Sequence, residues 1–171
     1  MRNIVLIGFM GTGKSAVGKR LAAELGWTFC DTDKMVESRA GVTVGELFEK
    51  KGEPAFRALE REVVRELSEK EGFVISTGGG VPLEPENVQD LSAKGELICL
   101  TASPETILKR VERKIGARPL LLGPNPLERI KTLMEERRPF YGQASFTLDT
   151  TYLSIEKITD AILRRMRTVD A

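Results

Sequence analysis

The chain has 171 residues, the length of one ordinary domain, with 41% hydrophobic and 30% charged residues. This balance excludes a mostly disordered, collagen-like or polytopic membrane protein. Lys and Arg number 26 and Asp and Glu 25, and the resulting formal charge of +1 gives no general argument for binding nucleic acid or membranes. Because the chain has no histidine, Ser-His-Asp or Cys-His catalysis and His-ligated zinc sites are also excluded.

Apolar, β-branched runs alternate along the chain with segments of helical spacing. In chain order we expect a strand at 4–7, a helix at 14–25 ended by Gly26, a strand at 28–30, short helices at 34–39 and 44–50 separated by Gly41, and a long helix opened by Pro54 and reaching about residue 70. A strand at 73–75, a helix at 86–94, a strand at 96–101, helices at 103–113 and 127–138, a strand at 146–148 and a helix at 155–166 follow. This alternation predicts an α/β fold, in which a mostly parallel sheet is covered by helices on both faces. No linker is visible, so residues 1–171 are expected to form a single domain.

The two cysteines and the N-terminal residues indicate the cellular location of the protein. Cys30 and Cys99 each lie in an apolar run, which is typical of reduced core residues in a cytosolic protein; a functional disulfide is the alternative. The apolar residues 4–7 break at Gly8 and are followed by no cleavage pattern, so they do not resemble a signal peptide. No apolar run approaches the roughly 18 residues of a membrane span. We therefore expect a cytoplasmic protein with no membrane partner.

Residues 8–15, Gly-Phe-Met-Gly-Thr-Gly-Lys-Ser, match the phosphate-loop motif G-x-x-x-x-G-K-[ST] between an expected strand and an expected helix. Glycines let backbone amides curl around phosphate oxygens, and the helix N-terminus adds donors and partial positive charge. Lys14 would place its charge between the β- and γ-phosphates, and Ser15 would offer its hydroxyl to Mg²⁺. The chain is therefore expected to bind a nucleoside triphosphate with Mg²⁺.

Asp31-Thr32-Asp33 follows the second expected strand, at the edge where parallel sheets bind ligands. In extended chain the two carboxylates would point the same way. One could then reach the Mg²⁺ hydration shell while the other holds an acceptor hydroxyl. The alternative is that this segment only caps the helix that follows.

Three glycines and two arginines complete the candidate site. Gly78-Gly79-Gly80 follows the third expected strand, where backbone donors could approach a ligand closely, or where the segment could be a simple loop. Arg57 lies in the first turns of the expected long helix, and Arg137 precedes Pro139 on a later helix, where arginine is suited to two-pronged recognition of a carboxylate. Taken alone, each is more typical of a surface role, Arg57 paired with Glu53 or Glu60 and Arg137 at a solvated helix end.

The class of phosphate-loop protein is narrowed by what else the chain contains. No Asn-Lys-x-Asp guanine motif is present, which argues against a GTPase, and motor ATPases are usually larger. Residues 116–126 contain two glycines, three prolines and Arg118. A flexible segment that carries an arginine suits a kinase whose lid closes over ATP, because excluding water prevents hydrolysis from competing with transfer.

Six motifs in order and at family spacing resemble the shikimate kinase family. They are the phosphate loop, Asp31-Thr32-Asp33, Phe56-Arg57, Gly78-Gly79-Gly80, Arg118-Pro119-Leu120-Leu121 and Arg137-x-Pro-x-Tyr141. The resemblance covers nearly the whole chain. It implies a three-layer P-loop kinase fold whose five-stranded parallel sheet has the order 2-3-1-4-5, with a mobile lid at about residues 112–126 and a substrate-binding helical part at about residues 33–61.

The resemblance also implies a role for each matching residue. ATP would be cradled by Gly11, Thr12, Gly13, Lys14, Ser15 and Ala16 and contacted by Arg118 on the lid, with Arg110 near the adenine; Ser15, and Asp31 through water, would hold Mg²⁺. Asp33 would orient or deprotonate the 3-hydroxyl of shikimate, Arg57 and Arg137 would bind its carboxylate, and Gly78, Gly79 and Gly80 would contact it. Lys14, Asp33 and Arg118 would be the catalytic residues. The implied reaction converts ATP and shikimate to ADP and shikimate 3-phosphate in aromatic amino-acid biosynthesis, carried out by an expected monomer.

Alternatives to this interpretation stay open at this point. Another small-metabolite kinase, such as a gluconate kinase, shares the phosphate loop and the size but need not have paired arginines at these positions. A silent nucleotide-binding module would be expected to have lost Lys14, Asp33 or Arg118, and all three are present. The basic stretch 109–114 contains Glu112 and no aromatic residue, so no nucleic-acid partner is expected.

One segment departs from the family pattern. Some members carry basic residues after the last strand, near the adenine, whereas Asp149-Thr150-Thr151-Tyr152-Leu153 has none. Adenine contacts there would be made by the backbone or by stacking on Tyr152.

Overall fold

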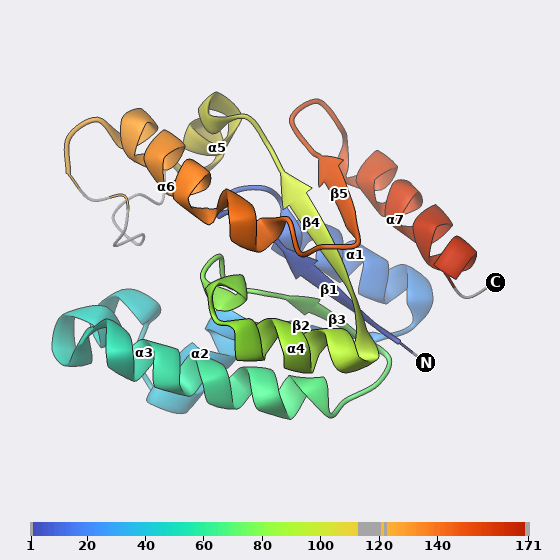
Figure 1. Ribbon diagram of the computed structural model, residues 1–171, viewed down its shortest axis with the longest axis horizontal. Helices are drawn as coiled ribbons and strands as arrows, with labels where there is room; N and C mark the ends of the chain where they lie inside the picture. Colours follow the sequence, from blue (N-terminus) through green and yellow to red (C-terminus); the bar gives the residue numbers. More distant parts are fainter. Residues whose placement is uncertain (1, 113–120, 122, 170–171) are drawn as a thin grey trace.

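The computed structural model describes residues 2–112, 121 and 123–169. Within these residues, parallel strands form one sheet in the order β2-β3-β1-β4-β5 (Figure 1). The strands are β1 (Asn3–Ile7), β2 (Thr28–Asp31), β3 (Phe73–Ser76), β4 (Gly95–Thr101) and β5 (Phe146–Asp149). The helices are α1 (Lys14–Leu25), α2 (Thr32–Ala40), α3 (Val44–Ser68), α4 (Pro85–Lys94), α5 (Pro104–Val111), α6 (Pro126–Tyr141) and α7 (Ile155–Val169), and Val81–Leu83 form a 3₁₀ turn, η1. The predicted α/β fold and strand order are confirmed.

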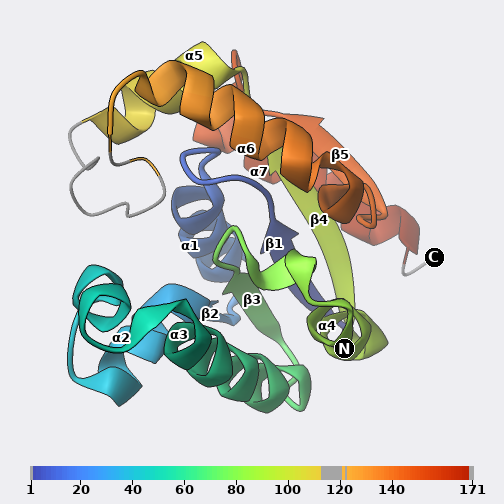
Figure 2. The same cartoon turned by 60° about the vertical axis from the view of Figure 1, so that its left-hand side comes forward.

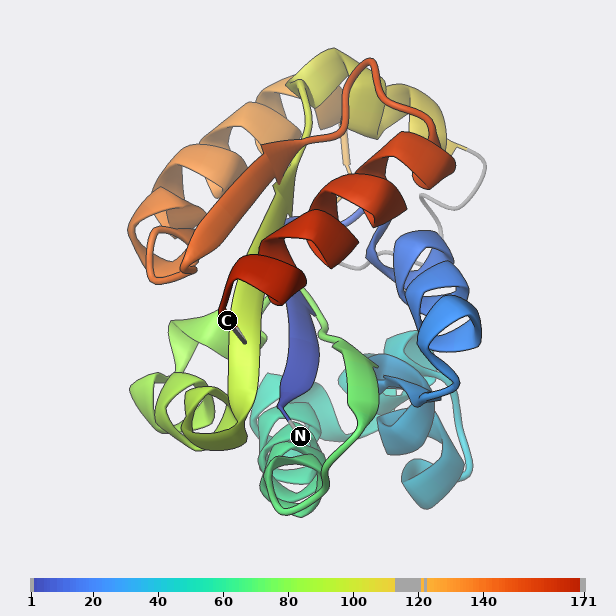
Figure 3. The same ribbon diagram turned by 90° about the vertical axis from the view of Figure 1, so that its right-hand side faces the viewer.

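The sheet is the middle layer of three. Helices α1 and α7 cover one face, where Val17 and Ile162 are buried, and α3 and α4 cover the other, where Val63 and Leu91 are buried (Figure 3). All five residues of the central strand β1 are buried, as expected for a parallel sheet covered on both faces. Among the residues that the structure describes, no helix has the length and apolar character needed to cross a membrane.

Of the element boundaries that differ from the sequence prediction, those at Gly52 and Pro139 have a clear physical reason. The predicted helices at 44–50 and 54–70 form one element, α3, which is interrupted at Gly52, where φ is 79° and ψ is 172°. Glycine adopts this conformation readily, so the chain kinks just before Pro54. The sequence predicts the end of another helix at residue 138, whereas α6 runs through Pro139 to Tyr141. A proline in the last turn removes one backbone donor but leaves little helix beyond it to disrupt.

The carboxyl ends of β1, β2 and β3 meet at one edge of the sheet. Asp31 at the end of β2 pairs with Ser76 of β3, which in turn pairs with Leu6 of β1. The turn into α1, the start of α2 and the loop before η1 therefore leave the sheet side by side (Figure 2). The sequence motifs that follow these three strands are brought together by this register.

The two cysteines are free thiols, as expected for reduced core residues. Cys99 is buried in β4 and Cys30 is partly buried in β2. Burial raises the pKa of both thiols, that of Cys99 to about 11. Neither thiol is therefore ionised enough near neutral pH to be a reactive nucleophile.

Thr150, which follows β5 and is fully buried, joins the phosphate loop to two other elements. Its hydroxyl oxygen lies 2.9 Å from the carbonyl oxygen of Thr12 and 3.0 Å from that of Thr101, and accepts a hydrogen bond from Arg110 Nη1 at 3.1 Å. Its backbone amide donates to the Thr101 carbonyl at 2.7 Å. One residue thus fixes the phosphate loop relative to the end of β4 and to α5.

We predict that Thr150→Val lowers both stability and nucleotide affinity. The variant keeps the shape of the side chain but leaves the Thr12 carbonyl without this partner, which should cost about 1–3 kcal/mol of unfolding free energy. Urea denaturation and calorimetric titration with ADP would measure the two effects, and Thr150→Ser should restore both. Thr159→Val is the matched control, because Thr159 is equally buried but bonds only within its own helix, to the Ile155 carbonyl. Equal ADP affinity in the two valine variants would contradict the role of Thr150.

Candidate active site

The phosphate loop closes around the ammonium group of Lys14. Lys14 Nζ donates to the carbonyl oxygens of Gly8 at 2.7 Å and Phe9 at 2.9 Å, and the side chain is almost fully buried. Thr12 Oγ1 donates to the same Phe9 carbonyl at 2.8 Å. A positive charge is therefore held inside the loop, directly before the backbone amides that open α1. This combination is the one that binds polyphosphate groups.

Two glycines of the loop are required by their surroundings. Gly8 has φ of 136°, and a Cβ there would lie 2.1 Å from the carbonyl oxygen of Leu100. Gly11 has φ of 74°, and a Cβ would lie 2.8 Å from a methyl carbon of Val111. The loop therefore packs directly onto β4 and α5, so any side chain at these positions would displace it.

Asp31 caps the following helix, as the sequence alternative had it, and its second carboxylate oxygen also faces the phosphate loop. Its Oδ1 caps α2 by accepting from the amides of Asp33 at 3.0 Å and Lys34 at 3.3 Å. Its Oδ2 accepts from the hydroxyl of Ser15 at 2.7 Å, and that hydroxyl also lies 3.3 Å from Ser76 Oγ. The capping interaction orients the carboxylate so that its second oxygen faces the start of α1.

The Ser15–Asp31 pair fits a magnesium ion that is shared with a nucleotide. In the described part of the chain, no group of three or more Cys, Asp and Glu residues could enclose a metal ion. Mg²⁺ commonly takes one or two protein oxygens and completes its octahedron with water and phosphate oxygens. A hydroxyl and a carboxylate 2.7 Å apart beside the phosphate loop match that donor set.

Asp33 reaches the site by a different geometry from the one predicted. The expectation that Asp31 and Asp33 are parallel in extended chain is wrong, because α2 begins at Thr32 and Asp33 lies in its first turn. Asp33 instead points at Gly78, where an added Cβ would lie 2.5 Å from Asp33 Oδ1. The buried Thr32 hydroxyl holds the two segments together by accepting from the Gly78 amide at 2.8 Å.

Each glycine of the loop before η1 faces a different charged side chain. A Cβ on Gly78 would contact Asp33 and Glu60, one on Gly79 would lie 3.0 Å from Arg137 Nη1, and one on Gly80 would lie 2.4 Å from the Arg57 guanidinium. None of the three requires a positive φ. These glycines are therefore needed for close approach of charged groups to the backbone, not for backbone conformation.

Arg57 makes both ion pairs that the sequence offered as its surface explanation, and it also faces the site. It bonds Glu60 Oε1 at 2.7 Å and Glu53 Oε1 at 3.2 Å, and its guanidinium carbon lies 5.1 Å from the ring centroid of Phe56. Its side chain is only 22% exposed. The two carboxylates thus hold a partly buried guanidinium group against Gly80.

Glu60 is a buried acid beside the glycine loop. It is 1% exposed, and among the described residues its Oε2 has no hydrogen-bond partner. Burial raises the pKa of Glu60 to about 6, and the nearby Asp33 adds to this rise, while Arg57 and Arg137 oppose it. Perturbed acids of this kind cluster at functional sites.

Arg137 is buried, so the alternative interpretation of this residue as a solvated helix end is wrong. It is 6% exposed, and its guanidinium carbon lies 5.6 Å from the ring centroid of Phe9. Four residues later on α6, the Tyr141 hydroxyl donates to the Gly79 carbonyl at 2.8 Å. Burial raises the pKa of Tyr141 to about 12, which keeps this donor protonated. Helix α6 is therefore fixed to the three-glycine loop at two points.

Of the remaining predicted residues, some lie on the nucleotide side of the site and the others lie outside the described residues. Arg110 donates to the Gly11 carbonyl at 3.1 Å and to Thr150, so it lies beside the phosphate loop. Tyr152 is 96% exposed on the neighbouring loop. Arg118 and most of the predicted lid, residues 113–120 and 122, lie outside the described residues.

Sequence reasoning missed three positioning residues: Thr32, Glu60 and Thr150. Glu60 was visible only as a helical neighbour of Arg57, and Thr32 and Thr150 only as parts of short polar segments. Their partners are 46 positions away for Thr32 and up to 138 for Thr150, which no local pattern reveals.

Comparison with known proteins agrees with this geometry. The family model described as shikimate kinase matches residues 10–167. A curated shikimate kinase from Caldanaerobacter subterraneus is 48% identical over 164 residues, which are 96% of this chain and 95% of the relative. Among solved structures, a shikimate kinase from Acinetobacter baumannii in complex with shikimate has a TM-score of 0.94 at 35% identity, covering 98% of this chain and 94% of that one. One from Aquifex aeolicus has a TM-score of 0.84 at 40% identity, covering 96% of each. With its fold, its motifs and these matches in agreement, the chain belongs to the shikimate kinase family.

Proposed function

We propose that this shikimate kinase transfers the γ-phosphoryl group of ATP to the 3-hydroxyl of shikimate, giving shikimate 3-phosphate and ADP. The 3-hydroxyl oxygen forms the new bond to phosphorus, and the bond to the oxygen bridging the β- and γ-phosphates breaks. The hydroxyl proton passes to Asp33 and then to solvent. The reaction belongs to aromatic amino-acid biosynthesis, as it does for the family.

One observation carries the proposal: the carboxylate of Asp33 and the guanidinium groups of Arg57 and Arg137 converge on three successive glycines beside the phosphate loop. A carboxylate that receives a hydroxyl and two arginines that receive a carboxylate fit a small hydroxy acid. The structurally similar Acinetobacter enzyme was solved with shikimate bound. That complex supports the same acceptor here.

On the nucleotide side, residues 11–16 would cradle the phosphates and Lys14 would neutralise the transferring group. Mg²⁺ would be held by Ser15 and, through water, by Asp31, and when bound it neutralises charge on the β- and γ-phosphates. Arg118, on a lid of about residues 112–126, would close on the transferring group. Support for the lid comes from the sequence motif, because these residues lie largely outside the described part of the chain.

On the acceptor side, Asp33 would hold the 3-hydroxyl in line with the γ-phosphate, and Arg57 and Arg137 would clamp the carboxylate at the far end. The backbone of Gly78, Gly79 and Gly80 would contact the ring. Positioning of this kind supplies most of the catalysis in phosphoryl transfer, because the protein forms no covalent bond to the transferred group.

The adenine would lie between Arg110 and the loop after β5, where the exposed ring of Tyr152 offers a stacking surface.

A cytoplasmic location is supported by the two free thiols, which are typical of reducing compartments. We propose that the enzyme acts as a monomer, because all the residues assigned to the site come from one chain.

The direct test is a coupled ADP-release assay with ATP, Mg²⁺ and shikimate, with gluconate as the alternative acceptor. We expect release that depends on shikimate and none above background with gluconate. Gluconate-dependent release would assign the chain to another small-metabolite kinase. Measurable ATP binding without release in either case would indicate a silent module.

Arg57→Lys should raise the KM for shikimate about tenfold or more, because lysine keeps the charge beside Glu60 but loses the two-pronged contact. The KM for ATP should change less than about twofold. Methyl shikimate has the same hydroxyls without the carboxylate, so its KM should respond little to this substitution. Arg61→Lys is the matched control, because Arg61 lies one turn along α3 and pairs with Asp90 and Glu86 instead. An equal rise in KM for shikimate and for its methyl ester would contradict the proposal that Arg57 binds the carboxylate.

Binding of an anionic substrate should be linked to the protonation of Glu60. The groups that face this carboxyl are Arg57 on the same helix, Asp33 on α2 and Arg137 on α6. A carboxylate bound between the two arginines would add negative charge near Glu60 and draw Arg57 from it. Both effects raise its pKa further above about 6. A ligand that raises a pKa takes up protons, so its affinity is highest below that pKa and falls as pH rises through it.

We therefore predict that the dissociation constant for shikimate rises several-fold between pH 6 and pH 8 in the wild-type enzyme. Glu60→Gln should flatten this dependence, because the amide does not titrate. Isothermal titration in buffers of different ionisation enthalpy would measure both the affinity and the proton uptake. Glu53→Gln is the control, since Glu53 also pairs with Arg57 but is 53% exposed. The same pH profile in wild type and Glu60→Gln would show that Glu60 is not the linked group.

A further inference from the structure

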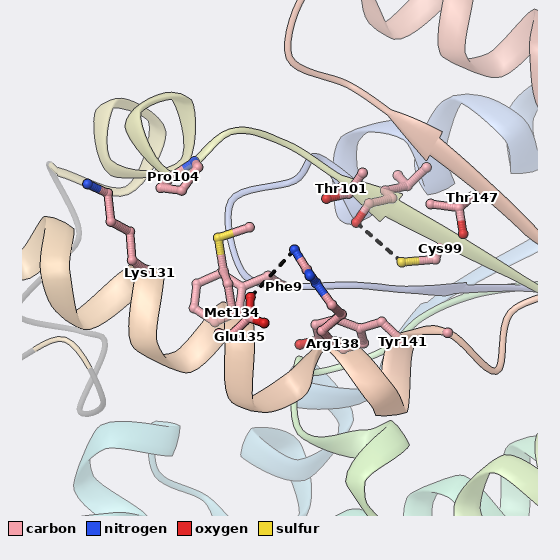
Figure 4. Close-up of a pocket in the computed structure, with 12 residues that line it drawn as sticks. Phe9, Cys99, Thr101, Pro104, Lys131, Met134, Glu135, Arg138, Tyr141 and Thr147 are labelled. Atoms are coloured by element: carbon pink, nitrogen blue, oxygen red, sulfur yellow. Dashed lines mark hydrogen bonds and ion pairs between the residues drawn. The ribbon is translucent and has the colours of Figure 1, made fainter.

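A cavity of about 440 Å³ lies outside the site described above, between α6 and the carboxyl ends of β4 and β5 (Figure 4). This volume is within the range of small-molecule sites, roughly 300–1,000 Å³. None of the glycines of the phosphate loop or of Gly78–Gly80 lines it, and neither Arg57 nor Asp33 does. Phe9 of the phosphate loop does line it, so the cavity adjoins the proposed binding sites for ATP and shikimate without including the residues assigned to contact the two substrates.

The inner surface of the cavity is apolar and aromatic. Its lining includes Phe9, Leu100, Pro104, Met134 and Tyr141. Figure 4 shows the Met134 side chain pointing across the cavity, close to the ring of Phe9. A flexible thioether and two aromatic rings make a surface that accepts a flat ring, because sulfur and aromatic groups both contact aromatic ligands favourably.

The mouth of the cavity carries two cations on α6, Lys131 and Arg138. Arg138 pairs with Glu135 at 3.5 Å and Lys131 with Glu128 at 3.3 Å, and all four side chains are at least 45% exposed. Such surface pairs contribute little, at most about 1 kcal/mol. A ligand carboxylate can therefore replace Glu135 on the Arg138 guanidinium, which offers a two-pronged contact.

Two hydroxyl groups lie at the sheet end of the same cavity. Thr101 at the end of β4 and Thr147 on β5 both line it (Figure 4). In the described part of the chain neither hydroxyl oxygen takes part in a hydrogen bond. They leave hydrogen-bonding capacity on the sheet side of the cavity, while the two cations lie on the α6 side.

We propose that this cavity is a second small-molecule site, which binds an aromatic monocarboxylate with its ring against Met134 and Phe9 and its carboxylate on Arg138. The ring matches the apolar lining and the single negative charge matches the cations at the mouth. Both partners of the charge pair stay near solvent, which avoids the cost of burying an unpaired ion.

The cavity shares two walls with the substrate clamp. Phe9 lines the cavity and supports the guanidinium of Arg137 at 5.6 Å. Tyr141 lines the cavity and donates to the Gly79 carbonyl at 2.8 Å. Because the cavity and the clamp share these two side chains, a ligand packed against Phe9 and Tyr141 is expected to stabilise the clamp arrangement as well. Occupancy should therefore strengthen shikimate binding, and shikimate should strengthen binding at the cavity by the same factor.

The test uses phenylacetate as the probe and 2-phenylethanol, which has the same ring without the charge, as its neutral counterpart. Both are titrated into protein labelled with ¹³C at the methionine methyl groups, in the presence of saturating shikimate so that the substrate site is filled. We expect the Met134 resonance, assigned with Met134→Leu, to shift with saturation, and that of Met35, in the core around α3, to stay in place. Phenylacetate should bind about tenfold more tightly than 2-phenylethanol. Equal affinities, or a probe displaced by shikimate, would overturn the proposal.

Three variants locate the binding without relying on turnover. Met134→Trp fills the cavity and should abolish the binding of phenylacetate, and Arg138→Gln should weaken it about tenfold. Glu136→Gln, an exposed change on α6 outside the lining, should leave it unchanged. Shikimate titrations with and without phenylacetate should show a several-fold tighter dissociation constant in the wild type and no change in Met134→Trp. Full phenylacetate affinity in Met134→Trp would contradict the site, and an unchanged shikimate constant in the wild type would contradict its connection to the clamp.

Discussion

Around Gly78-Gly79-Gly80, side chains from three separate helices lie so close to the backbone that an added Cβ would make them shift. Asp33 comes from α2, Arg57 from α3 and Arg137 from α6, and each lies against a different glycine. The same constraint acts at Gly8, where the phosphate loop contacts the backbone of β4. Bare backbone at these positions is what brings the phosphate loop and the charged residues into one small volume.

The charges gathered there nearly balance one another. Asp33 and Glu60 face Arg57 and Arg137 in a largely buried environment, so each charge depends on its neighbours. A substrate that brings a carboxylate to the arginines and a hydroxyl to Asp33 rearranges these pairs without leaving a buried charge alone. Glu60 can then take up a proton when the substrate binds, because burial has already raised its pKa to about 6.

Much of the fold could be predicted from the sequence, because the strands, the glycine helix ends and the phosphate loop are local patterns. The strand order came from the family resemblance, and the structure confirms it. What the sequence could not supply were contacts between distant segments, such as Thr150 with Thr12 and Tyr141 with Gly79. The Asp31–Asp33 geometry was predicted wrongly for a related reason. The N-cap that Asp31 provides starts the helix at Thr32, two residues before the expected start at residue 34, so Asp33 is helical and not extended.

Helix α6 connects the residues that would clamp shikimate with the proposed second small-molecule site. Its Arg137 and Tyr141 lie on the three-glycine loop, while Met134 and Arg138 line the cavity of the proposed second site. Movement of this one helix would alter the substrate clamp and the cavity together, which gives the molecule a route from a surface site to its catalytic edge.

The most direct measurement of the central claim is a crystal structure of the enzyme with ADP, Mg²⁺ and shikimate. The account predicts the shikimate carboxylate between the guanidinium groups of Arg57 and Arg137, and its 3-hydroxyl within hydrogen-bond reach of Asp33 on the side facing the phosphate loop. A substrate bound in the opposite sense, with its carboxylate toward Lys14 or its 3-hydroxyl away from Asp33, would contradict it.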